Sequence, residues 1–312
     1  MFVSIGIATY QRPQELKRLI DSLSQLKFEA IATPQIEIIV VENDSQPLTQ
    51  DYCLDSQQHG SPWPIKYSLE PQRGLSYVRN AIIDNINPES DFLAFIDDDE
   101  VVTVHWLEAL IQTQVKFSAD VVSGPVIHLF SQVLPDWVRS ANLFPLVRYP
   151  TGTKRPIAFT CNVMIRAQLL KDQKNRFDRR FALSGGEDTH FFMRIYRQGC
   201  RIVWCDEALV YDHMPSSRMT MKWFLVRNYR NYGSHSFCEK ELDLWYKVFP
   251  KRFATGMGRI IIGSICFLVG IPLFFWSRKI VIEALLQIAR GLGILAGLLG
   301  IQYQEYQNVH SA

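Results

Sequence analysis

The chain has 312 residues, of which 47% are hydrophobic and 21% are charged, and this composition excludes a mainly disordered protein. Its 33 basic and 31 acidic side chains leave a formal net charge of +2, so no nucleic-acid partner is expected from a broad basic surface. The six cysteines form no C-x-x-C pair, which argues against a zinc site and favours reduced thiols on the cytosolic side of a membrane.

Apolar segments of strand and helix length alternate along the first 215 residues. We expect strands at residues 3–9, 36–41, 65–69, 92–96 and 120–126. Helical spacing of apolar residues predicts helices at residues 13–26, 74–86, 106–117 and 189–198. The alternation predicts an α/β fold, with a Rossmann-like and mainly parallel sheet flanked by helices. Ligands of such folds bind at the carboxyl ends of the strands.

The character of the sequence changes near residue 251. Residues 260–276 contain no charged side chain, and residues 280–301 contain only Glu283 and Arg290. A bilayer span needs ~20 apolar residues, so we expect residues 241–312 to be membrane-associated apolar helices that follow a catalytic domain at residues 1–240. The alternative is a buried helical hairpin of a soluble protein.

Basic residues around the apolar runs bear on orientation. Four of them precede the first run: Lys247, Lys251, Arg252 and Arg259. The positive-inside bias then places the preceding domain on the cytoplasmic face of the cell membrane. A hairpin of two full spans would carry Arg278 and Lys279 to the outside against this bias, whereas a re-entrant or interfacial helix pair avoids the conflict. No secretory signal peptide is expected at the N-terminus.

An acidic run, Asp97-Asp98-Asp99-Glu100, follows the apolar run at residues 92–96. Clustered carboxylates at the end of a strand repel one another unless a cation relieves them. Hard divalent ions take oxygen ligands, and Mg²⁺ typically combines one or two carboxylates with substrate phosphates. The run therefore predicts a metal–diphosphate site, and its alternative is a solvated acidic turn.

Two further polar clusters end predicted strands or begin predicted helices. Gly185-Gly186-Glu187-Asp188 precedes the predicted helix at 189–198, where a carboxylate could remove a proton from an attacking hydroxyl or could simply cap the helix. Glu42-Asn43-Asp44-Ser45 follows the strand at 36–41 and could hydrogen-bond a ribose or base, or form an ordinary turn.

Single residues give weaker signals. Arg79 could face a phosphate or form a surface ion pair. His213 could be a metal ligand, although a lone histidine is more often structural. A basic and aromatic helix at residues 218–232 could contact anionic lipid or a diphosphate, or expose a charged outer face.

Five segments, taken in order, resemble family 2 glycosyltransferases of the GT-A fold. The segments are Val3–Pro13, Ile38–Ser45, Arg73–Asn80, Asp97–Asp99 and Gly186–Asp188. Residues 213–227 look like bacterial exopolysaccharide glycosyltransferases of the succinoglycan-biosynthesis type. Two departures are that Glu42 stands where aspartate is commoner, and that Cys161-Asn162 replaces a more usual Gly-Asn ahead of an expected acceptor-side helix at residues 163–170.

The resemblance implies an inverting transfer from a nucleotide-diphosphate sugar to a hydroxyl acceptor, and the apolar C-terminal region suggests that this acceptor is a saccharide or lipid-linked saccharide. It implies that the nucleoside is held by Thr9, Tyr10, Arg12, Glu42 and Asp44, with Asp97 and Asp98 near the base or ribose. Asp99 would bind Mg²⁺ or Mn²⁺, with His213 as a further ligand. Asp188 would be the general base, and Glu187 would position the loop or the acceptor.

Two other functions fit parts of the sequence. Asp97–Val101 fits the D-x-D-x-[TV] pattern of haloacid-dehalogenase-type phosphohydrolases, but it comes late in the chain, and that family's downstream acid pair is not supplied by residues 185–188. A membrane-tethered nucleotide-sugar-binding module without activity is the non-enzymatic alternative, against which the intact Asp99 and Asp188 argue. P-loop and G-x-G-x-x-G signatures are absent, which disfavours NTPases and dinucleotide dehydrogenases.

Overall fold

A computed structural model describes residues 1–272 and 278–306 and divides the chain into two compact units. The first unit comprises Met1–Leu129, Leu146–Leu183 and Phe191–His213, and the second comprises Phe130–Pro145, Ser184–His190 and Met214–Ala312. The last residues of the predicted apolar run at 260–276, and of the predicted segment 241–312, lie outside the described residues. The functional division predicted at residue 240 stays a prediction.

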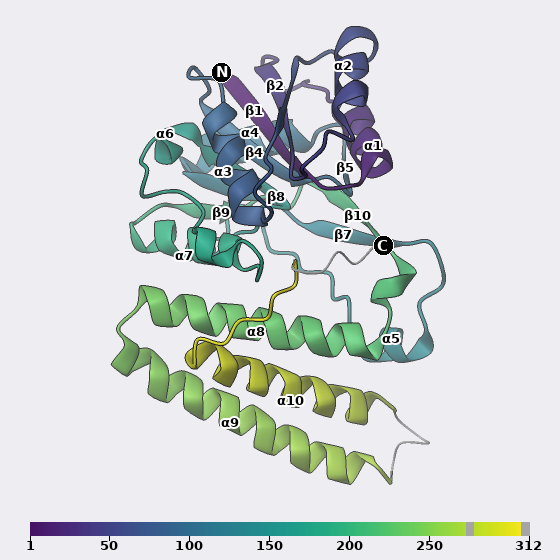
Figure 1. Ribbon diagram of the computed structural model, residues 1–312, viewed down its shortest axis with the longest axis vertical. Coiled ribbons are helices and arrows are strands. Elements are labelled where there is room, and N and C mark those ends of the chain that lie inside the picture. The colour runs from purple at the N-terminus through teal and green to yellow at the C-terminus, as the bar shows by residue number, and fades with distance from the viewer. Residues whose placement is uncertain (273–277, 307–312) are drawn as a thin grey trace. The chain divides into compact units, whose positions relative to one another are not determined.

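The first unit is built on a seven-stranded sheet with the strand order β3-β2-β1-β4-β8-β6-β9 (Figure 1). Its strands are β1 (Phe2–Thr9), β2 (Gln35–Glu42), β3 (Ile65–Leu69), β4 (Phe92–Asp97), β6 (Val121–Ser123), β8 (Asn162–Arg166) and β9 (Ile202–Trp204). Neighbouring strands are parallel except that β8 is antiparallel to both β4 and β6. The predicted α/β architecture with a mainly parallel sheet is therefore confirmed.

Helices cover both faces of this sheet because its central strands are apolar on both sides. The helices α1 (Pro13–Leu23), α2 (Gln50–His59) and α4 (Trp106–Phe117) pack on the face that carries Val3, Ile5 and Ile7. The helices α3 (Leu75–Asn85), α6 (Ala167–Leu170) and α7 (Glu187–Arg197) pack on the face that carries Leu93 and Phe95. The hydrophobic layers between these helices and the sheet cover its two faces, so polar residues gather at its carboxyl edge.

A smaller sheet follows the acidic run. It contains β5 (Glu100–Val102), β10 (Val210–Met214) and β7 (Val126–Phe130) in the order β5-β10-β7. β10 is antiparallel to β5 and pairs Asp212 with Glu100. This sheet brings residues more than 100 positions apart in the chain to the end of β4.

The structure corrects three details of the predicted elements. Residues 163–170 do not form one helix, because residues 162–166 are the strand β8 and only α6 is helical. A short apolar run such as Val163-Met164-Ile165 has no period that separates a strand from a helix, and pairing with β4 decides the outcome. The predicted strand at 120–126 ends at Ser123, and β7 begins at Val126. The helix α2 was not predicted, since its sequence is polar and weakly periodic.

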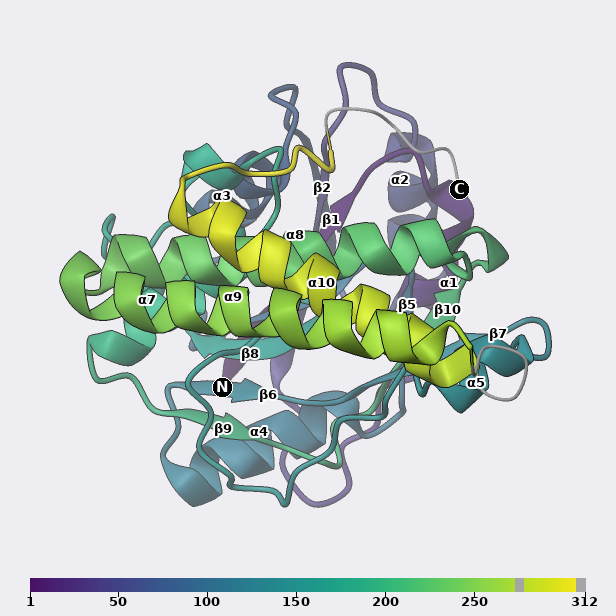
Figure 2. The same cartoon turned by 90° about the horizontal axis from the view of Figure 1, so that it is seen from below.

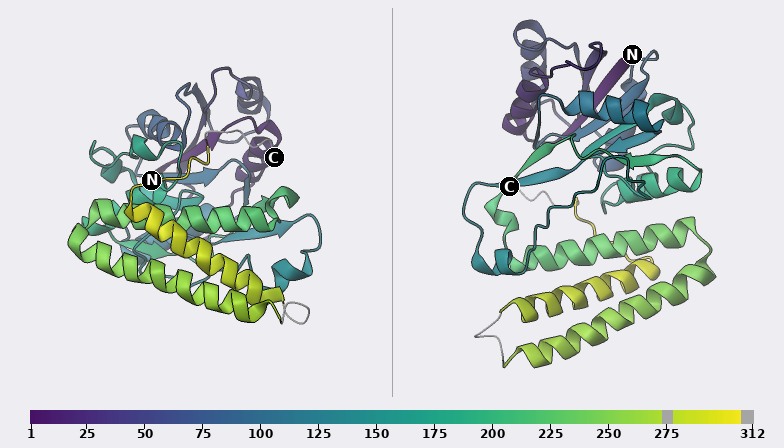
Figure 3. Two further views of the ribbon diagram at one scale, coloured as in Figure 1. Left: turned by 60° about the horizontal axis from the view of Figure 1, so that its bottom comes forward. Right: turned by 180° about the vertical axis from the view of Figure 1, so that it is seen from behind.

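The second unit is helical. It contains α5 (Asp136–Ser140), α8 (Met221–Leu242), α9 (Trp245–Gly270) and α10 (Arg278–Leu298). The helix α10 packs along both α8 and α9, as Figures 2 and 3 show from three directions. The expected apolar runs thus become the hairpin of α9 and α10, while the basic and aromatic helix expected at 218–232 lies largely in α8.

Glycines allow the helices of the second unit to approach closely. A Cβ added at Gly293 would lie 2.1 Å from the carbonyl oxygen of Tyr229, and one at Gly297 would lie 2.2 Å from that of Gly233. Between α9 and α10, a Cβ at Gly291 would lie 2.6 Å from the carbonyl oxygen of Gly256. Backbone contacts of this kind are typical of helices that associate within membranes.

Gly74, at the start of α3, joins three segments of the first unit. Its amide donates to Asn43 Oδ1 over 2.7 Å, and the next amide, of Leu75, donates to the carbonyl oxygen of Ala182 over 3.0 Å. Its φ is +133°, and an added Cβ would lie 2.6 Å from the Cβ of Ala182. Only glycine adopts this conformation without strain and fits the space.

We therefore expect Gly74→Ala to lower the free energy of unfolding by about 3 kcal/mol, since backbone strain and overpacking add. Gly199→Ala is the matched control, because Gly199 also has a positive φ, +95°, but an added Cβ would meet nothing within 4 Å. The control should lose only about 1 kcal/mol. Urea unfolding measures both, and equal losses would contradict the packing role of Gly74.

Candidate active site

The carboxyl ends of β1, β2 and β4 form the polar edge of the sheet. In the strand register, Thr9 lies opposite Glu42 on one side, and Ala8 lies opposite Asp97 on the other. Two of the predicted polar clusters, Glu42–Ser45 and Asp97–Glu100, therefore meet Thr9 at one edge, as parallel strands require.

Arg12 and the acidic run form the centre of this edge. The guanidinium Nη1 of Arg12 lies 2.7 Å from Asp99 Oδ2 and 3.3 Å from Asp98 Oδ1. Thr9 Oγ1 donates to Asp98 Oδ2 over 2.8 Å. Thus Thr9, Arg12, Asp98 and Asp99, predicted as site residues, lie in one hydrogen-bonded group.

The carboxylates at this edge carry more negative charge than their surroundings stabilise. Burial and then the charge of Asp99 raise the pKa of Asp98 to about 7, against the opposing effects of Arg12 and Thr9. Burial and the charges of Asp97 and Asp99 likewise raise the pKa of Glu100 well above its usual value. A further cation at this edge would therefore be stabilised.

Asp97 faces a different cation. The Nη2 atom of Arg79 lies 3.7 Å from Asp97 Oδ1, and the Arg79 side chain is buried in the middle of α3. Its guanidinium also lies over the ring of Phe177, 5.8 Å from the centroid. The predicted pair of site residues Arg79 and Asp97 is thus brought together by α3 and β4.

The turn after β1 presents Tyr10 and Gln11 beside the turn after β2. Gln11 has a φ of +53° and donates from Nε2 to Asp44 Oδ2 over 2.9 Å. This hydrogen bond lowers the pKa of Asp44. The Arg73 guanidinium lies over the ring of Tyr10, 5.4 Å from its centroid. Gln11 was not predicted as a site residue, because a single exposed amide leaves no pattern in the sequence.

Glu42 is fully buried and folds the loop that follows β2. Its Oε2 atom accepts hydrogen bonds from the amides of Leu48 and Thr49, each over 3.0 Å, and from the hydroxyls of Thr49 and Tyr67. Its predicted contact with a nucleoside stays a prediction. The observed role is structural, since this carboxylate fixes the loop that carries Asp44.

Next to Glu100, the last residue of the acidic run, the structure places two titratable groups that the sequence did not reveal: buried Asp212 and partly buried His128. Asp212 of β10 pairs with Glu100 in the register and accepts or shares a proton with His128 Nδ1 over 2.9 Å. Its second oxygen, Oδ1, is buried without a hydrogen-bond partner among the described residues. Only the pairing of β5, β10 and β7 brings these three residues together.

The oxygen-rich donor set suits a hard divalent cation, but it does not form a complete cage. Among residues 1–272 and 278–306, no three histidine, cysteine, aspartate or glutamate side chains converge as metal ligands. His213 is exposed, next to Asp212. A cation here would need oxygen atoms from a substrate, and the positive charge now beside Asp99 is that of Arg12.

Asp188 is the second residue of α7, which follows two glycines with positive φ, Gly185 at +75° and Gly186 at +87°. Its side chain is partly exposed, whereas that of Glu187 is buried. The following turns of α7 place Phe191 in the first unit's core, where it stacks on Phe177, and Phe177 contacts Phe95 of β4. The part of α7 from Phe191 onward is therefore anchored in the core of the first unit.

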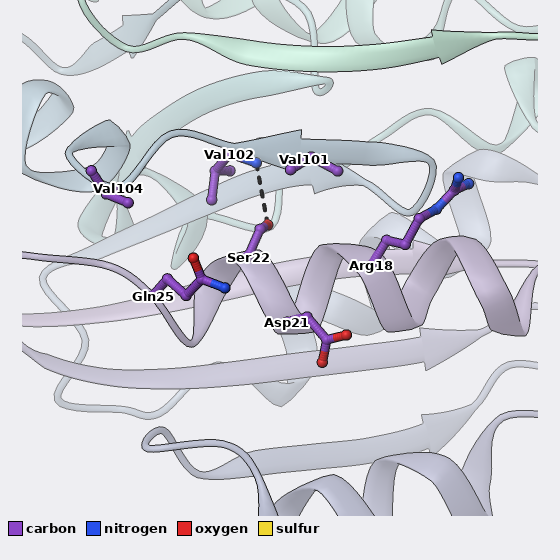
Figure 4. Close-up of a pocket in the computed structure, with 7 residues that line it drawn as sticks. All are labelled: Arg18, Asp21, Ser22, Gln25, Val101, Val102 and Val104. Atoms are coloured by element: carbon purple, nitrogen blue, oxygen red, sulfur yellow. Dashed lines mark hydrogen bonds between the residues drawn. The ribbon is translucent and has the colours of Figure 1, made fainter. Parts of the chain in front are cut away.

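A hollow in the first unit lies between α1 and the β5 segment (Figure 4). It has a volume of about 330 Å³ and is lined by Arg18, Asp21, Ser22, Gln25, Val101, Val102 and Val104. The Val102 amide donates to Ser22 Oγ across it over 3.2 Å. None of the predicted site residues lines it, so we assign it no function.

Comparisons with known proteins agree on the class of protein. The family model "Glycosyl transferase family 2" matches residues 4–173. The succinoglycan biosynthesis protein ExoM of Rhizobium meliloti (strain 1021) is 32% identical over 237 residues, which cover 75% of this chain and 74% of ExoM. ExoW of the same organism is 25% identical over 224 residues, covering 66% and 67% of the two chains.

Solved structures share the fold. S. aureus TarS 1-349, crystallised in complex with UDP-GlcNAc, matches with a TM-score of 0.55 at 17% identity, over 97% of this chain and 93% of that one. At this identity the likeness concerns the fold, and the fold class predicted from the sequence, a GT-A-type sheet flanked by helices, is confirmed.

The contacts of Arg12 lead to a stability prediction. Arg12→Ala leaves Asp98 buried without its charge partner, and we expect the free energy of unfolding to fall by about 2 kcal/mol, less than for a fully buried pair because Arg12 is one-third exposed. Arg18→Ala, which breaks the exposed pair with Glu15, is the matched control and should change it by less than about 0.5 kcal/mol.

Adding Asp98→Asn to Arg12→Ala should recover part of the loss, since the unpaired charge is removed while Thr9 keeps an acceptor. Denaturant unfolding of the wild type, Arg12→Ala, Arg18→Ala and the double variant Arg12→Ala/Asp98→Asn checks these predictions. A double variant no more stable than Arg12→Ala alone would contradict the role of Arg12 as counter-ion.

Proposed function

The chain belongs to glycosyl transferase family 2, and we propose that it is an inverting enzyme. It transfers a sugar from a nucleotide-diphosphate sugar to a hydroxyl acceptor in the synthesis of a cell-surface polysaccharide or exopolysaccharide. The observation that carries this proposal is the acidic edge at the end of β4, with Arg12 against Asp98 and Asp99. The relatives named for succinoglycan biosynthesis support the polymer class.

The donor binds along the carboxyl edge of the sheet. Thr9, Tyr10, Arg12, Glu42 and Asp44 contribute to the nucleoside side of this site, with Asp97 and Asp98 close to the base or ribose. Arg79, buried beside Asp97, adds positive charge toward the phosphates. The UDP-GlcNAc and UDP complexes of TarS, which has the same fold, support a nucleotide-sugar donor.

A divalent cation, Mg²⁺ or Mn²⁺, fits the chemistry of these donors. Asp99 would hold it together with diphosphate oxygens, and His213 is a further candidate ligand. When bound, the cation neutralises the negative charge that builds up on the departing diphosphate. The raised pKa of Asp98 and of Glu100 supports a site that is completed by added positive charge.

Asp188 acts as the general base on the acceptor. Its carboxylate removes the proton of the acceptor hydroxyl, and that oxygen attacks C1 of the sugar from the face opposite the diphosphate. The new C1–O bond forms as the bond from C1 to the diphosphate oxygen breaks, so the anomeric centre inverts and nucleoside diphosphate leaves. Partial exposure of Asp188 and burial of Glu187 support this division of roles.

The acceptor is a saccharide carried on a lipid, and the enzyme works at the cytoplasmic face of the cell membrane. The helices α9 and α10 support membrane association, since both are long and apolar enough to be membrane helices by composition, with a mean hydropathy of 1.7 over their most apolar windows. The family membership and the named relatives favour this function over a phosphohydrolase or an inactive binding module.

A donor screen tests the proposal. Purified protein should transfer sugar from one member of a panel of nucleotide sugars, only with Mg²⁺ or Mn²⁺, and onto an acceptor in a bacterial membrane extract. The product should partition into organic solvent, as expected of a lipid-linked saccharide. Transfer that is equally fast to water-soluble sugars would contradict the lipid-linked acceptor, and release of phosphate from a generic phosphomonoester would contradict the reaction.

The role of Asp188 has its own test. Asp188→Asn should slow transfer by ~10²–10⁴-fold, because the acceptor proton loses its base. Binding of nucleoside diphosphate, measured by calorimetry, should not change. Asp136→Asn is the matched control, since Asp136 is also an acid in the first turn of a helix, α5, and its side chain is exposed. Transfer by Asp188→Asn at the wild-type rate would contradict the assignment.

A further inference from the structure

The helix α9 exposes an unbroken aliphatic stripe in its second half. Ile261, Ile262, Ile265, Leu268 and Val269 follow the spacing of one helical face, and each is between 51% and 67% exposed. Gly263 and Gly270, on the other side of the helix, are buried. A contiguous apolar surface of this kind normally has an occupant.

Two arginines in the middle of the hairpin point inward, whereas Lys279 and Glu283, which pair near the start of α10, are about half exposed. The guanidinium groups of Arg259, from α9, and Arg290, from α10, lie over the ring of Tyr232 of α8, at 5.1 and 5.5 Å from its centroid. Arg259 also donates to Gln287, and Arg290 donates to Asn228 Oδ1 over 2.8 Å. Charges inside and aliphatic side chains outside are the distribution expected of helices that face lipid.

Cations and aromatic rings surround the aliphatic stripe. The helix α9 carries four basic and no acidic side chains, and Lys247 and Lys251 are exposed at its start. Four exposed aromatic residues accompany them: Trp245, Tyr246, Phe249 and Phe253. Arg278 and Lys279 begin α10 at the other end of the hairpin. Aromatic rings favour the headgroup region, and cations are attracted to anionic headgroups.

Two features argue against a hairpin of two full spans. The charge-free run that begins in α9, residues 260–276, has 17 residues, slightly fewer than the ~20 that a bilayer span needs. In addition, α10 packs along α8, which has six charged side chains. A spanning α10 would therefore draw a polar helix into the hydrocarbon.

We propose that the outer face of α9 lies in a single leaflet of an anionic membrane, with both ends of the α9–α10 hairpin at headgroup level on the same side. This inference rests on the membrane attachment proposed above and defines the surface and the depth through which it acts. The occupant of the aliphatic stripe is thus the lipid itself rather than a second copy of the chain.

Vesicle flotation of the full chain tests the surface. We expect the protein to float with phosphatidylglycerol-containing vesicles and to bind pure phosphatidylcholine vesicles at least tenfold more weakly, since each basic residue contributes to attraction. Ile262→Asp and Leu268→Asp should each weaken flotation. Val115→Asp is the matched control, because Val115 is an equally exposed aliphatic residue on α4, and it should float like the wild type.

Accessibility of introduced thiols tests the depth. Lys247→Cys and Lys279→Cys, each in a Cys266→Ser background that removes the exposed native thiol, should react equally with a membrane-impermeant reagent on vesicle-bound protein, as read by peptide mass. Nitroxides at positions 261, 265 and 268 should report similar depths, all shallower than the bilayer midplane.

The possible outcomes distinguish membrane attachment through α9 from the single-leaflet arrangement of the hairpin. Protection of Lys279→Cys but not of Lys247→Cys, or nitroxide depths that pass the midplane, would overturn the single-leaflet arrangement and leave the attachment intact. Absence of flotation on every vesicle would overturn both, without bearing on sugar transfer. A dimer in solution that Leu268→Asp converts to monomer, with no flotation, would show that a second copy occupies the stripe.

Discussion

The repulsion among the carboxylates that end β4 is the constraint on which the rest of this site depends. Asp97, Asp98 and Asp99 follow one another at the sheet edge, where burial of Asp98 and then the charge of Asp99 raise the pKa of Asp98 to about 7. Arg12, 86 residues earlier in the chain, supplies part of the missing positive charge. A site of this kind favours a ligand that brings more positive charge, which is what a cation–diphosphate group does. The parallel strands β1, β2 and β4 allow it to form, because their ends meet at one edge.

In the second unit, the α9–α10 hairpin turns two charged side chains inward and exposes apolar ones. Aliphatic side chains of α9 are exposed, while the guanidinium groups of Arg259 and Arg290 lie over the ring of Tyr232 of α8. Glycines at the helix crossings bring the backbones close enough for these contacts. Farther along α8, hydrogen bonds from His235 and Arg252 outweigh the effect of burial and lower the pKa of Glu239 to about 2.

Much of the fold followed from periodicity, because the strands β1, β2 and β4 and the helices α1, α3 and α4 have long apolar patterns. The sequence also predicted part of the site, since acidic residues that follow a buried strand must lie at the edge of the sheet whatever the position of that strand. Three features lay beyond the pattern. The apolar run of β8 is equally compatible with a helix, and only its pairing with β4 makes it a strand. The contact of Arg12 with Asp99 joins distant segments. The carboxylate of Glu42 at a strand end was expected to bind a ligand. Its observed hydrogen-bond partners, Thr49 and Tyr67, instead belong to the loop after β2 and to the neighbouring strand β3.

The central claim is that the acidic edge of β4 and the start of α7 serve one reaction. An experimental structure of the full chain with a nucleoside diphosphate and Mn²⁺ tests it most directly, with the metal located by its anomalous scattering. We predict a manganese peak at Asp99 that also touches the diphosphate, with the carboxylate of Asp188 facing the position of the sugar's C1. Manganese bound away from Asp99, or Asp188 turned to another face of the protein, would contradict the account.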